Sequence, residues 1–377
     1  MPWDPAATRS KFGLHLGPEQ LAVIQQNFLP LRPDQYMADM VFEGGGVLGT
    51  AFLGALRCCS DAGIRCADAA GTSAGAITAA LVASGLSIDE LESVFGPLDF
   101  QSFLSEKTSW MLFGGDPATE MGSGIFGLLA ALVVSGAEGK YSTNPFYLWM
   151  KERLKARNVR TFADLPAIQR VGEDTASRRQ LEVIAADISL GAMMVLPRSL
   201  KLPQYQAFGN APETFEVAEA VRLSMSIPLF FAPGKLLKST IVDGGVASNF
   251  PLWLFDSPPG ETPPYPTFGF RLMDNAPEPS ISNAVGVLKA LLTTMRTAHD
   301  RYYLQEKDKR RVINIDITAT STFNVSATKF NLSDDDKAEL YRRGYVATRD
   351  FLLNVNDKGW SWRDHLQARG IAPANIG

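Results

Sequence analysis

An apolar run that ends in glycines and is followed by a helical pattern occurs twice near the start of this 377-residue chain. Residues 37–42 lead into the sequence GGGVLG at 44–49, and residues 67–70 lead into GTSAG at 71–75. Apolar side chains at helical spacing follow each glycine motif. Two successive strand–loop–helix units predict a parallel sheet covered by helices, because parallel neighbours need a long crossover between them.

The rest of the chain continues this α/β pattern. Further strands are expected at residues 181–185, 193–196, 240–242, 267–272 and 312–317. Helices are expected at residues 18–28, at 285–307 and after Ser333, which fits an N-cap followed by three aspartates. The predicted fold is a three-layer α/β/α domain with a mostly parallel central sheet. We expect it to span residues 36–355, between an N-terminal extension at 1–35 and a C-terminal tail at 356–377.

Composition narrows the class of partner. The formal net charge is −4, and no basic stripe indicates a nucleic-acid surface. The longest apolar stretch covers only residues 125–134, whereas spanning a bilayer takes about 20 residues. Three cysteines form no metal-binding pattern, and no secretory signal is visible at the N-terminus. The sequence predicts a cytoplasmic protein that contacts membranes peripherally, with export as an effector left open. It indicates no cofactor, no metal and no oligomeric state.

The GTSAG sequence fits the G-x-S-x-G pattern of a serine nucleophile. Small flanking residues let a sharp strand-to-helix turn close, which exposes the Ser73 hydroxyl and places the next N–H at the helix start. The local pattern of strand, turn and helix is the context that this chemistry needs. The alternative is an ordinary turn in which Ser73 only caps a helix.

The glycines at residues 44–49 can direct backbone N–H groups toward an anion at a helix N-terminus, and a developing oxyanion is such an anion. The same glycines also satisfy G-x-G-x-x-G, the pattern of a dinucleotide site. That site needs an acidic residue at the end of the second strand. Here the second strand leads into Ser73 instead, and Asp68 precedes its apolar part.

Asp243 begins an Asp-Gly-Gly sequence after a short expected strand. As a pattern this is also a plain turn, but a serine nucleophile needs a base. An ordinary aspartate has a pKa of about 3.9 and is a poor base at neutral pH. Burial at the edge of a lipid-binding cleft is the physical means of raising that pKa.

Histidine is the usual base, and the chain has only three: His15, His299 and His365. A triad of Ser73, Asp243 and His299 has the chain order found in α/β-hydrolases. However, His299 lies in an expected helix between charged neighbours, a setting typical of a solvated surface residue. A serine–aspartate dyad without histidine is the other arrangement.

Four more segments complete a resemblance to the patatin-like phospholipase family. They are TFADLP at 161–166, VIAAD at 183–187, AVRLSMSIP at 220–228 and VDGGVASNFP at 242–251. Together with the glycine loop and the GTSAG motif, the resemblance covers roughly residues 36–355.

The resemblance implies the patatin-like fold and hydrolysis of lipid acyl esters, as in a phospholipase or esterase, without metal or cofactor. It implies that Ser73 is the nucleophile and Asp243 the base in a catalytic dyad. The oxyanion-hole residues that it implies are Gly44, Gly45, Gly46 and Ala74, with the N–H groups of the last three as donors. Lipid or phospholipid is the implied substrate, met in transient contact with a membrane surface.

Two residues depart from the family pattern. Leu48 stands where the family often has a basic residue, so a contact to substrate phosphate is missing and acyl-ester hydrolysis is better supported than a phospholipid preference. Leu223 stands where a small residue is common. The apolar stretches at 110–113 and 121–136 suit a lid or an acyl-chain wall, or else ordinary core helix. A lipid-binding or regulatory protein that keeps this fold without turnover is the alternative from a different functional class.

Overall fold

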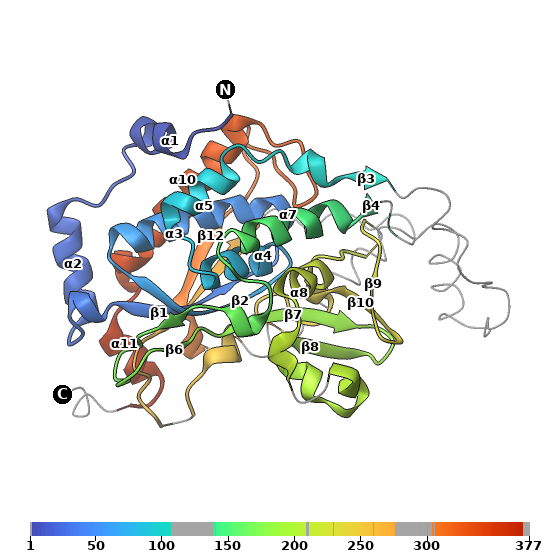
Figure 1. The fold of residues 1–377 in the computed structure, drawn as a ribbon. Helices are drawn as coiled ribbons and strands as arrows, with labels where there is room; N and C mark the ends of the chain where they lie inside the picture. The colour runs from blue at the N-terminus through green and yellow to red at the C-terminus, as the bar shows by residue number, and fades with distance from the viewer. Residues whose placement is uncertain are drawn as a thin grey trace.

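A mostly parallel central sheet with helices packed over it forms the body of the computed structural model (Figure 1). The structure describes residues 2–106, 139, 141–208, 211–228, 230–258, 260–275, 294, 300, 304 and 306–371. The strands of the main sheet are β1 (Met37–Phe42), β2 (Arg65–Thr72), β7 (Leu181–Asp187), β8 (Ala192–Leu196), β9 (Gly234–Leu236), β10 (Ser239–Asp243), β11 (Thr267–Met273) and β12 (Val312–Asp316). Their order is β12-β11-β1-β2-β7-β10-β9, and β8 pairs with β7 off this path.

The five strands from β12 to β7 are parallel to one another, whereas β8 and β10 run antiparallel to β7, and β9 antiparallel to β10. The described helices are α1 (Pro5–Phe12), α2 (Pro18–Phe28), α3 (Ala51–Asp61), α4 (Ala74–Ala83), α5 (Ile88–Phe95), α7 (Asn144–Lys155), α8 (Val217–Ser224), α10 (Asp334–Leu352) and α11 (Trp362–Ala368). Two small ladders pair β3 (Ser105–Glu106) with β4 (Tyr141–Ser142) and β5 (Ala167–Ile168) with β6 (Ser177–Arg178).

Strand β7 brings the ends of two other strands together. Its first part pairs with parallel β2, so that Thr72 lies opposite Ile184. Its last part pairs with antiparallel β10, so that Asp243 lies opposite Ala185. Because β8 pairs along both parts of β7, it occupies the other edge. The carboxyl ends of β2 and β10 therefore meet end to end on one edge of β7.

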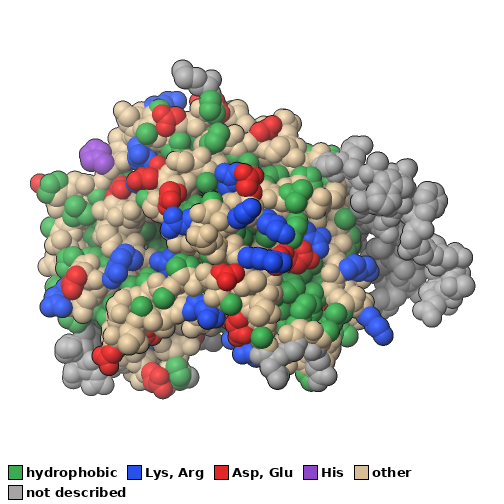
Figure 2. Space-filling view, viewed as in Figure 1, with side chains coloured by type: hydrophobic (Ala, Val, Ile, Leu, Met, Phe, Trp, Pro, Cys, Tyr) green, Lys and Arg blue, Asp and Glu red, His purple; other side chains and the backbone are tan. Residues whose placement is uncertain are grey.

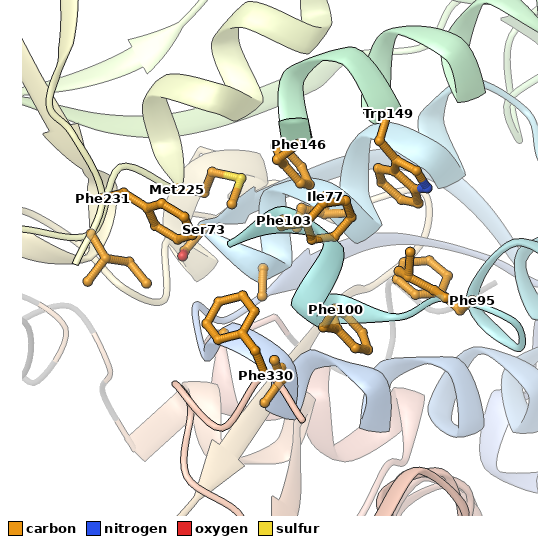
Figure 3. Close-up of a pocket in the computed structure, with 15 residues that line it drawn as sticks. Ser73, Ile77, Phe95, Phe100, Phe103, Phe146, Trp149, Met225, Phe231 and Phe330 are labelled. Carbon is orange, nitrogen blue, oxygen red and sulfur yellow. The ribbon is translucent and has the colours of Figure 1, made fainter. Parts of the chain in front are cut away.

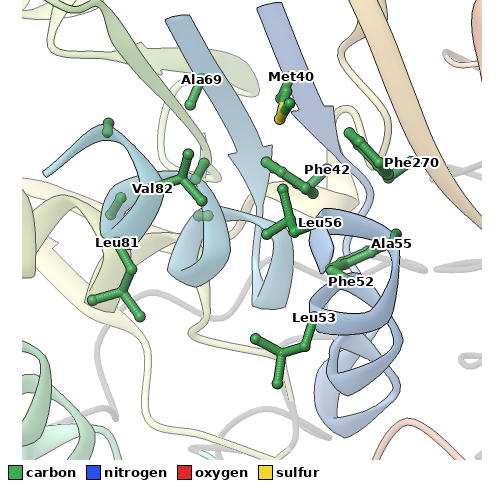
Figure 4. Packing of buried hydrophobic residues seen from close by; sticks show 14 of the residues in the cluster. Met40, Phe42, Phe52, Leu53, Ala55, Leu56, Ala69, Leu81, Val82 and Phe270 are labelled. Carbon is green, nitrogen blue, oxygen red and sulfur yellow. The ribbon is translucent and has the colours of Figure 1, made fainter. Parts of the chain in front are cut away.

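The sheet is buried on both faces, as its parallel strands require. On one face, Phe42 of β1 stacks on Phe270 of β11 with ring centroids 4.8 Å apart and packs against Phe52 of α3 (Figure 4). On the other face, Val41 belongs to a smaller apolar cluster with Leu252 of the 3₁₀ turn η10 (Leu252–Phe255). Successive residues of β1 thus serve opposite layers.

The flanking segments pack into the same core. Trp3, just before α1, lies edge-on to Tyr341 of α10 at 5.7 Å between ring centroids. Phe28 at the end of α2 contacts Trp360, which lies before α11 and packs on Phe268 of β11. Both termini therefore contribute to the main hydrophobic core, and the expected division at residues 35 and 355 stays a prediction.

The sequence-based expectations for secondary structure are largely confirmed. α2 and β1 have the predicted bounds, and α4 follows the GTSAG motif as expected. The later strands differ by one or two residues at their ends, and Ser333 caps α10 with its Oγ accepting from the N–H of Asp336. Strand β2 is longer than its short apolar run indicated, because residues beyond that run also pair with β1. The helix expected at 285–307 lies almost wholly outside the described residues.

Helices α3 and α10 pack at a distance that only glycine permits. A Cβ on Gly54 would overlap the carbonyl oxygen of Tyr341, and a Cβ on Gly344 would overlap that of Ala51. The two helices therefore approach each other backbone to backbone, which holds α3 and the glycine loop before it against the domain.

We predict that Gly54→Ala lowers the free energy of unfolding by about 1–3 kcal/mol through overpacking. At an unobstructed helix position the same change would stabilise the protein by about 1 kcal/mol. The sign of the change in unfolding free energy therefore tells whether the packing is as close as described. Urea denaturation measures it. In the control Gly17→Ser, at the N-cap of α2, the new Cβ meets only a glutamine side-chain oxygen at 3.9 Å, and serine is a preferred cap. An equal loss in both variants would contradict the packing explanation.

Candidate active site

Ser73 lies on the turn between β2 and α4, where the G-x-S-x-G pattern places a nucleophile. Its φ of 54° and ψ of −122° are angles that residues other than glycine rarely adopt. The flanking glycines are required by close contact: a Cβ on Gly71 would overlap the backbone of Gly75, and one on Gly75 would overlap the carbonyl oxygen of Phe42. The motif thus encodes a turn in which three backbone segments touch.

A buried side chain from α8 holds this strained turn. The N–H of Ser73 donates to Oγ of Ser224 at 2.8 Å, and Ser224 is fully buried at the last position of α8. The neighbouring Leu223, larger than the residue common in the family, fits because residue 234 is a glycine: a Cβ there would overlap the Leu223 side chain. Ser224 therefore acts as a positioning residue for the predicted nucleophile.

Asp243 is the last residue of β10 and is also buried. Its Oδ1 accepts from the N–H of Gly245 at 2.7 Å, which orients the carboxyl group at the start of the 3₁₀ turn η9 (Gly244–Val246). A Cβ on Gly244 would overlap the carbonyl oxygen of Ile184 in β7. The Asp-Gly-Gly sequence is therefore more than a plain turn, because its first glycine is required for contact with the sheet.

The structure brings the two predicted catalytic residues to one place. Ser73 and Asp243 stand at the strand ends that meet on β7, and residues 224–226, at the end of α8 and just beyond it, contact both. Ser224 accepts the N–H of Ser73, and the carbonyl oxygen of Ser226 accepts the N–H of Asp243 at 2.9 Å. Ser73 and Asp243, which are 170 positions apart in the sequence, are thus both held by hydrogen bonds to residues 224–226.

The glycine loop leads from β1 into the 3₁₀ turn η2 (Gly46–Thr50). Gly46 has φ +55°, and a Cβ on it would overlap the carbonyl oxygen of Ala327. The N–H of Gly44 donates to the carbonyl oxygen of Asn249 at 3.0 Å, so it is engaged within the protein. Ala74 is the first residue of α4, where a backbone N–H has no intrahelical acceptor.

These positions narrow the predicted oxyanion hole. Of its four residues, Gly44 serves as an anchor of the loop, because its N–H is bonded to Asn249. Gly45, Gly46 and Ala74 stay the predicted donors. Gly46 and Ala74 line the same pocket as Ser73.

Two residues that the sequence did not single out hold this loop in place. Asn249 donates from Nδ2 to the carbonyl oxygen of Gly44 at 3.0 Å and to Glu43 Oε1 at 3.1 Å. Asp300, buried, accepts from Ser248 Oγ and from the N–H groups of Asn249 and Phe250 at 3.0–3.1 Å. The signal for Asn249 was its place in the VDGGVASNFP segment. Nothing near Asp300 in the sequence indicates its role, since its partners are about 50 residues away.

An apolar pocket opens beside Ser73 (Figure 3). Besides Ser73 and small residues of the two loops, its walls carry Ile77, Phe95, Leu98, Phe100, Phe103, Phe146, Trp149, Met225, Ile227, Phe231 and Phe330. The space open to a water-sized molecule is only about 40 Å³. Several rings touch, as Phe103 does Phe146 with centroids 5.4 Å apart. A guest chain therefore has to be slender or has to displace these rings.

Much of the pocket wall comes from elements that the sequence did not point to, namely the end of α5, the 3₁₀ turn η3 (Phe100–Phe103) and α7. The rest comes from Ile77 of α4, from Phe330 and from residues 225–231, of which 225–228 belong to the AVRLSMSIP segment. The stretches at 110–113 and 121–136, predicted as a lid or an acyl-chain wall, lie outside the described residues. Leu48 is buried in η2 and does not line the pocket.

The three histidines have different positions. His299 lies outside the described residues, so the triad is not tested. His15 is exposed on the loop between α1 and α2. His365 is buried in α11 against Trp360 and Trp362, with ring centroids 5.2 and 5.9 Å away. Burial, and then the nearby charges of two arginines, lower the pKa of His365 to about 3. Neither His15 nor His365 lines the pocket.

Among the described residues, the candidate site contains neither a cysteine nor a cluster of metal-binding side chains. Cys58 and Cys59 are buried in α3, and burial raises the pKa of both thiols. Within the described residues, no group of three or more His, Cys, Asp or Glu side chains lies together as a metal site would need. Nor does any helix among those residues have the length and apolar character to cross a bilayer.

Comparison with known proteins identifies the family of this chain. The family model described as patatin-like phospholipase matches residues 40–256. The chain belongs to this family. The uncharacterized protein YqhO of Bacillus subtilis is 33% identical over 331 residues, which cover 86% of this chain and 99% of YqhO. An uncharacterized protein of Acanthamoeba polyphaga mimivirus is 21% identical over 333 residues, 85% of this chain and 96% of that protein.

Solved structures with a similar arrangement include two bacterial proteins. VipD of Legionella pneumophila matches with a TM-score of 0.43 at 17% identity, over 85% of this chain and 67% of VipD. ExoU of Pseudomonas aeruginosa, solved with SpcU, matches with a TM-score of 0.44 at 18% identity, over 89% of this chain. This chain spans 53% of the length of ExoU. The family match and the sheet together confirm the predicted mixed α/β fold with a mostly parallel sheet flanked by helices.

We predict that Ser224→Ala lowers kcat by about tenfold or more, because it leaves the buried N–H of Ser73 without its acceptor, a loss of about 1–3 kcal/mol. KM should change less than kcat, since Ser224 does not line the pocket. Ser224→Thr keeps the oxygen and should restore part of the rate. The matched control is Ser84→Ala, which removes a buried hydroxyl bonded to the carbonyl oxygen of Leu81 at the far end of α4. Equal effects of the two alanine variants on kcat would contradict a positioning role.

We also predict that acid destabilises the fold through His365. Its folded-state pKa of about 3 lies below its unfolded value of about 6.5. The unfolded state therefore binds the proton first, and stability is lost as the pH falls from about 6.5 toward 3, by up to about 1.4 kcal/mol per pH unit. His365→Phe should flatten this part of the profile of unfolding free energy against pH, whereas the exposed His15→Gln should not. A profile unchanged by His365→Phe would refute the assignment.

Proposed function

We propose that this protein is a lipid acyl hydrolase that cleaves acyl esters through a Ser73–Asp243 dyad and an acyl-serine intermediate. The observation that carries the proposal is the end-to-end meeting of β2 and β10 on β7, which puts a buried serine and a buried aspartate together beside an apolar pocket. Family membership supports lipid hydrolysis in general.

In the proposed acylation step, Ser73 Oγ attacks the ester carbonyl carbon while its proton passes to the carboxylate of Asp243. The carbonyl oxygen becomes an oxyanion, which the N–H groups of Gly45, Gly46 and Ala74 stabilise by preorganised hydrogen bonds. The tetrahedral intermediate then expels the alcohol, which takes the proton from Asp243 as the acyl-serine forms.

Deacylation repeats these steps with water as the nucleophile. Asp243 takes a proton from the attacking water, the second tetrahedral intermediate collapses, and Ser73 Oγ recovers the proton as the fatty acid leaves. Because the hydrogen bond from Gly245 orients the Asp243 carboxyl group, the same group can serve both halves of the reaction without moving.

The pocket supports a lipid acyl chain as the part of the substrate that is recognised. No charged side chain belongs to the described residues that line it, and the site offers hydrophobic contact over its whole length. Leu48, where the family often has a basic residue, is buried and supplies no cation. We therefore propose recognition through the acyl chain, with lipid or phospholipid met at a membrane surface.

Two alternatives make different predictions. A lipid-binding or regulatory protein on the same fold would bind lipid without releasing fatty acid. An α/β-hydrolase-type triad of Ser73, Asp243 and His299 would need the histidine. The buried, oriented carboxylate of Asp243 next to the serine turn favours a catalytic protein over a binding protein. Both the dyad and the triad use this carboxylate, so His299→Ala is the variant that separates them.

The decisive experiment measures hydrolysis of a fluorogenic short-chain ester and of mixed phospholipid vesicles. We expect Ser73→Ala and Asp243→Asn each to lower kcat on the order of 10³-fold or more, and His299→Ala to leave it unchanged. Loss of activity in His299→Ala as well as in Asp243→Asn would replace the dyad by the triad, in which the aspartate also contributes. Lipid binding without release of fatty acid by the wild type would support the non-catalytic alternative.

A further inference from the structure

Two neighbouring turns at the end of the sheet expose large aliphatic side chains. The turn between β7 and β8 carries Ile188 and Leu190, each 53% exposed, and the turn between β9 and β10 carries Leu237, 51% exposed. We call the residues 188–191 and 237–238 the paired turns. In the described part of the chain, the other exposed large apolar residues are spread over separate elements, namely Phe12, Val23, Leu29, Leu148, Leu202 and Val355.

Hydrogen bonds join the paired turns into one unit. The N–H of Ile188 donates to the carbonyl oxygen of Thr240 at 3.0 Å, and the N–H of Thr240 donates to Ser189 Oγ at 2.9 Å. Figure 1 shows the two hairpins side by side at one end of the sheet, in green and yellow. The aliphatic side chains are therefore presented together, on a surface that the backbone holds in place.

A buried carboxylate fixes the first turn. Asp187 Oδ1 accepts from the N–H groups of Ser189 and Leu190 at 2.9 and 3.1 Å, and Oδ2 accepts from Tyr205 at 2.6 Å. Burial acts to raise the pKa of Asp187, but hydrogen bonds from Ser239, Tyr205 and the turn outweigh it and the pKa is lowered. The first turn is thus held in place by the buried carboxylate of Asp187.

The second turn places Leu237 in a backbone conformation that is unfavourable for leucine. Leu237 has φ +55°, a conformation suited to glycine or asparagine and unfavourable for a bulky side chain. In a two-residue hairpin these smaller residues are the usual choice. A leucine left 51% exposed at this position buries only part of its side chain in the fold, so the strain is better explained by an external contact.

The second turn carries the unbalanced positive charge. Beyond the first turn, Arg198 and Lys201 are paired with Glu182 and Glu213 at 3.8 and 3.6 Å. The second turn lies in residues 223–242, which contain Lys235 and Lys238 and no acidic residue. Both lysines are exposed. Figure 2, in the orientation of Figure 1, shows basic side chains on this right-hand rim. Aliphatic tips bordered by lysines match the chemistry of an anionic lipid surface.

The paired turns lie on the catalytic side of the sheet. Ile188 is four residues beyond Ile184, the partner of Thr72, which is roughly 13 Å along β7 in the direction of the carboxyl ends. The second hairpin is continuous with the pocket, since Phe231 lines the pocket and β9 begins at Gly234. A surface that binds the paired turns is thereby brought toward the edge that holds Ser73.

We propose that the paired turns are the element through which this protein docks on an anionic lipid bilayer, with Ile188, Leu190 and Leu237 entering the interface and Lys235 and Lys238 meeting lipid headgroups. The inference rests on the proposed function for its purpose, because docking presents ester bonds of the membrane to the catalytic edge. Its test is separate, since binding and hydrolysis are measured independently.

The test is sedimentation of the full chain with vesicles of phosphatidylcholine alone and of phosphatidylcholine with phosphatidylserine. The triple variant Ile188→Ser, Leu190→Ser, Leu237→Asn should bind the phosphatidylserine vesicles at least about tenfold more weakly than the wild type. The matched control Leu148→Ser, at an equally exposed leucine on α7, should bind like the wild type. Equal binding by the triple variant and the wild type would overturn the proposal.

The lysines give a second, independent readout. Lys235→Gln and Lys238→Gln should each weaken binding to phosphatidylserine vesicles about fivefold and should leave binding to neutral vesicles unchanged. Equal loss on both kinds of vesicle, or none on either, would contradict docking on an anionic surface.

Folding and catalysis are monitored separately. Leu237→Asn relieves the unfavourable φ, so its thermal midpoint should equal or exceed that of the wild type while its vesicle binding falls. All turn variants should hydrolyse the soluble short-chain ester at the wild-type rate and vesicle lipid more slowly. Lack of ester hydrolysis by the wild type would count against the proposed function alone. A wild-type dimer that ignores vesicles and becomes monomeric in the turn variants would assign the paired turns to self-association and overturn the proposal.

Discussion

The pairing of β7 with two strands along one edge is the constraint on which the site depends. Parallel β2 and antiparallel β10 each use part of that edge, so their carboxyl ends point at each other, with Thr72 opposite Ile184 and Asp243 opposite Ala185. Backbone hydrogen bonds set this register, and a shift by one residue would turn every side chain to the other face. The distance between the proposed nucleophile and base is thus set by the sheet and not by flexible loops.

Around this meeting point, backbones approach so closely that glycine is required, and buried polar groups are satisfied by residues from far along the chain. Gly71, Gly75 and Gly244 each lie where a Cβ would overlap backbone atoms. Ser224 and Asn249 supply hydrogen bonds to the two loops. Such a network is preorganised, because a half-satisfied buried polar group is costly and the partners leave little freedom to rearrange.

The apolar pocket and the paired turns would contact different parts of the lipid, namely the acyl chain and the membrane surface. The aromatic pocket beside Ser73 offers contact to an acyl chain and no charge. The paired turns offer exposed aliphatic side chains and lysines on the same side of the sheet. The pocket residues would then bind the acyl chain by hydrophobic contact, and the paired turns would bind the membrane by hydrophobic and electrostatic contact. The segment between α8 and β9 connects the two sets of residues.

The sequence by itself determined the α/β class, most strand positions and the identities of Ser73 and Asp243, because glycine punctuation and apolar periodicity are local properties of the chain. Their roles were inferred from the resemblance to a family and stay predictions. It did not determine that Gly44 anchors the loop through Asn249, that Ser224 and Asp300 support the site, or that α5, η3 and α7 form the pocket walls. Those facts depend on contacts between residues distant in the chain, and such contacts exist only once strand register and helix packing have placed them.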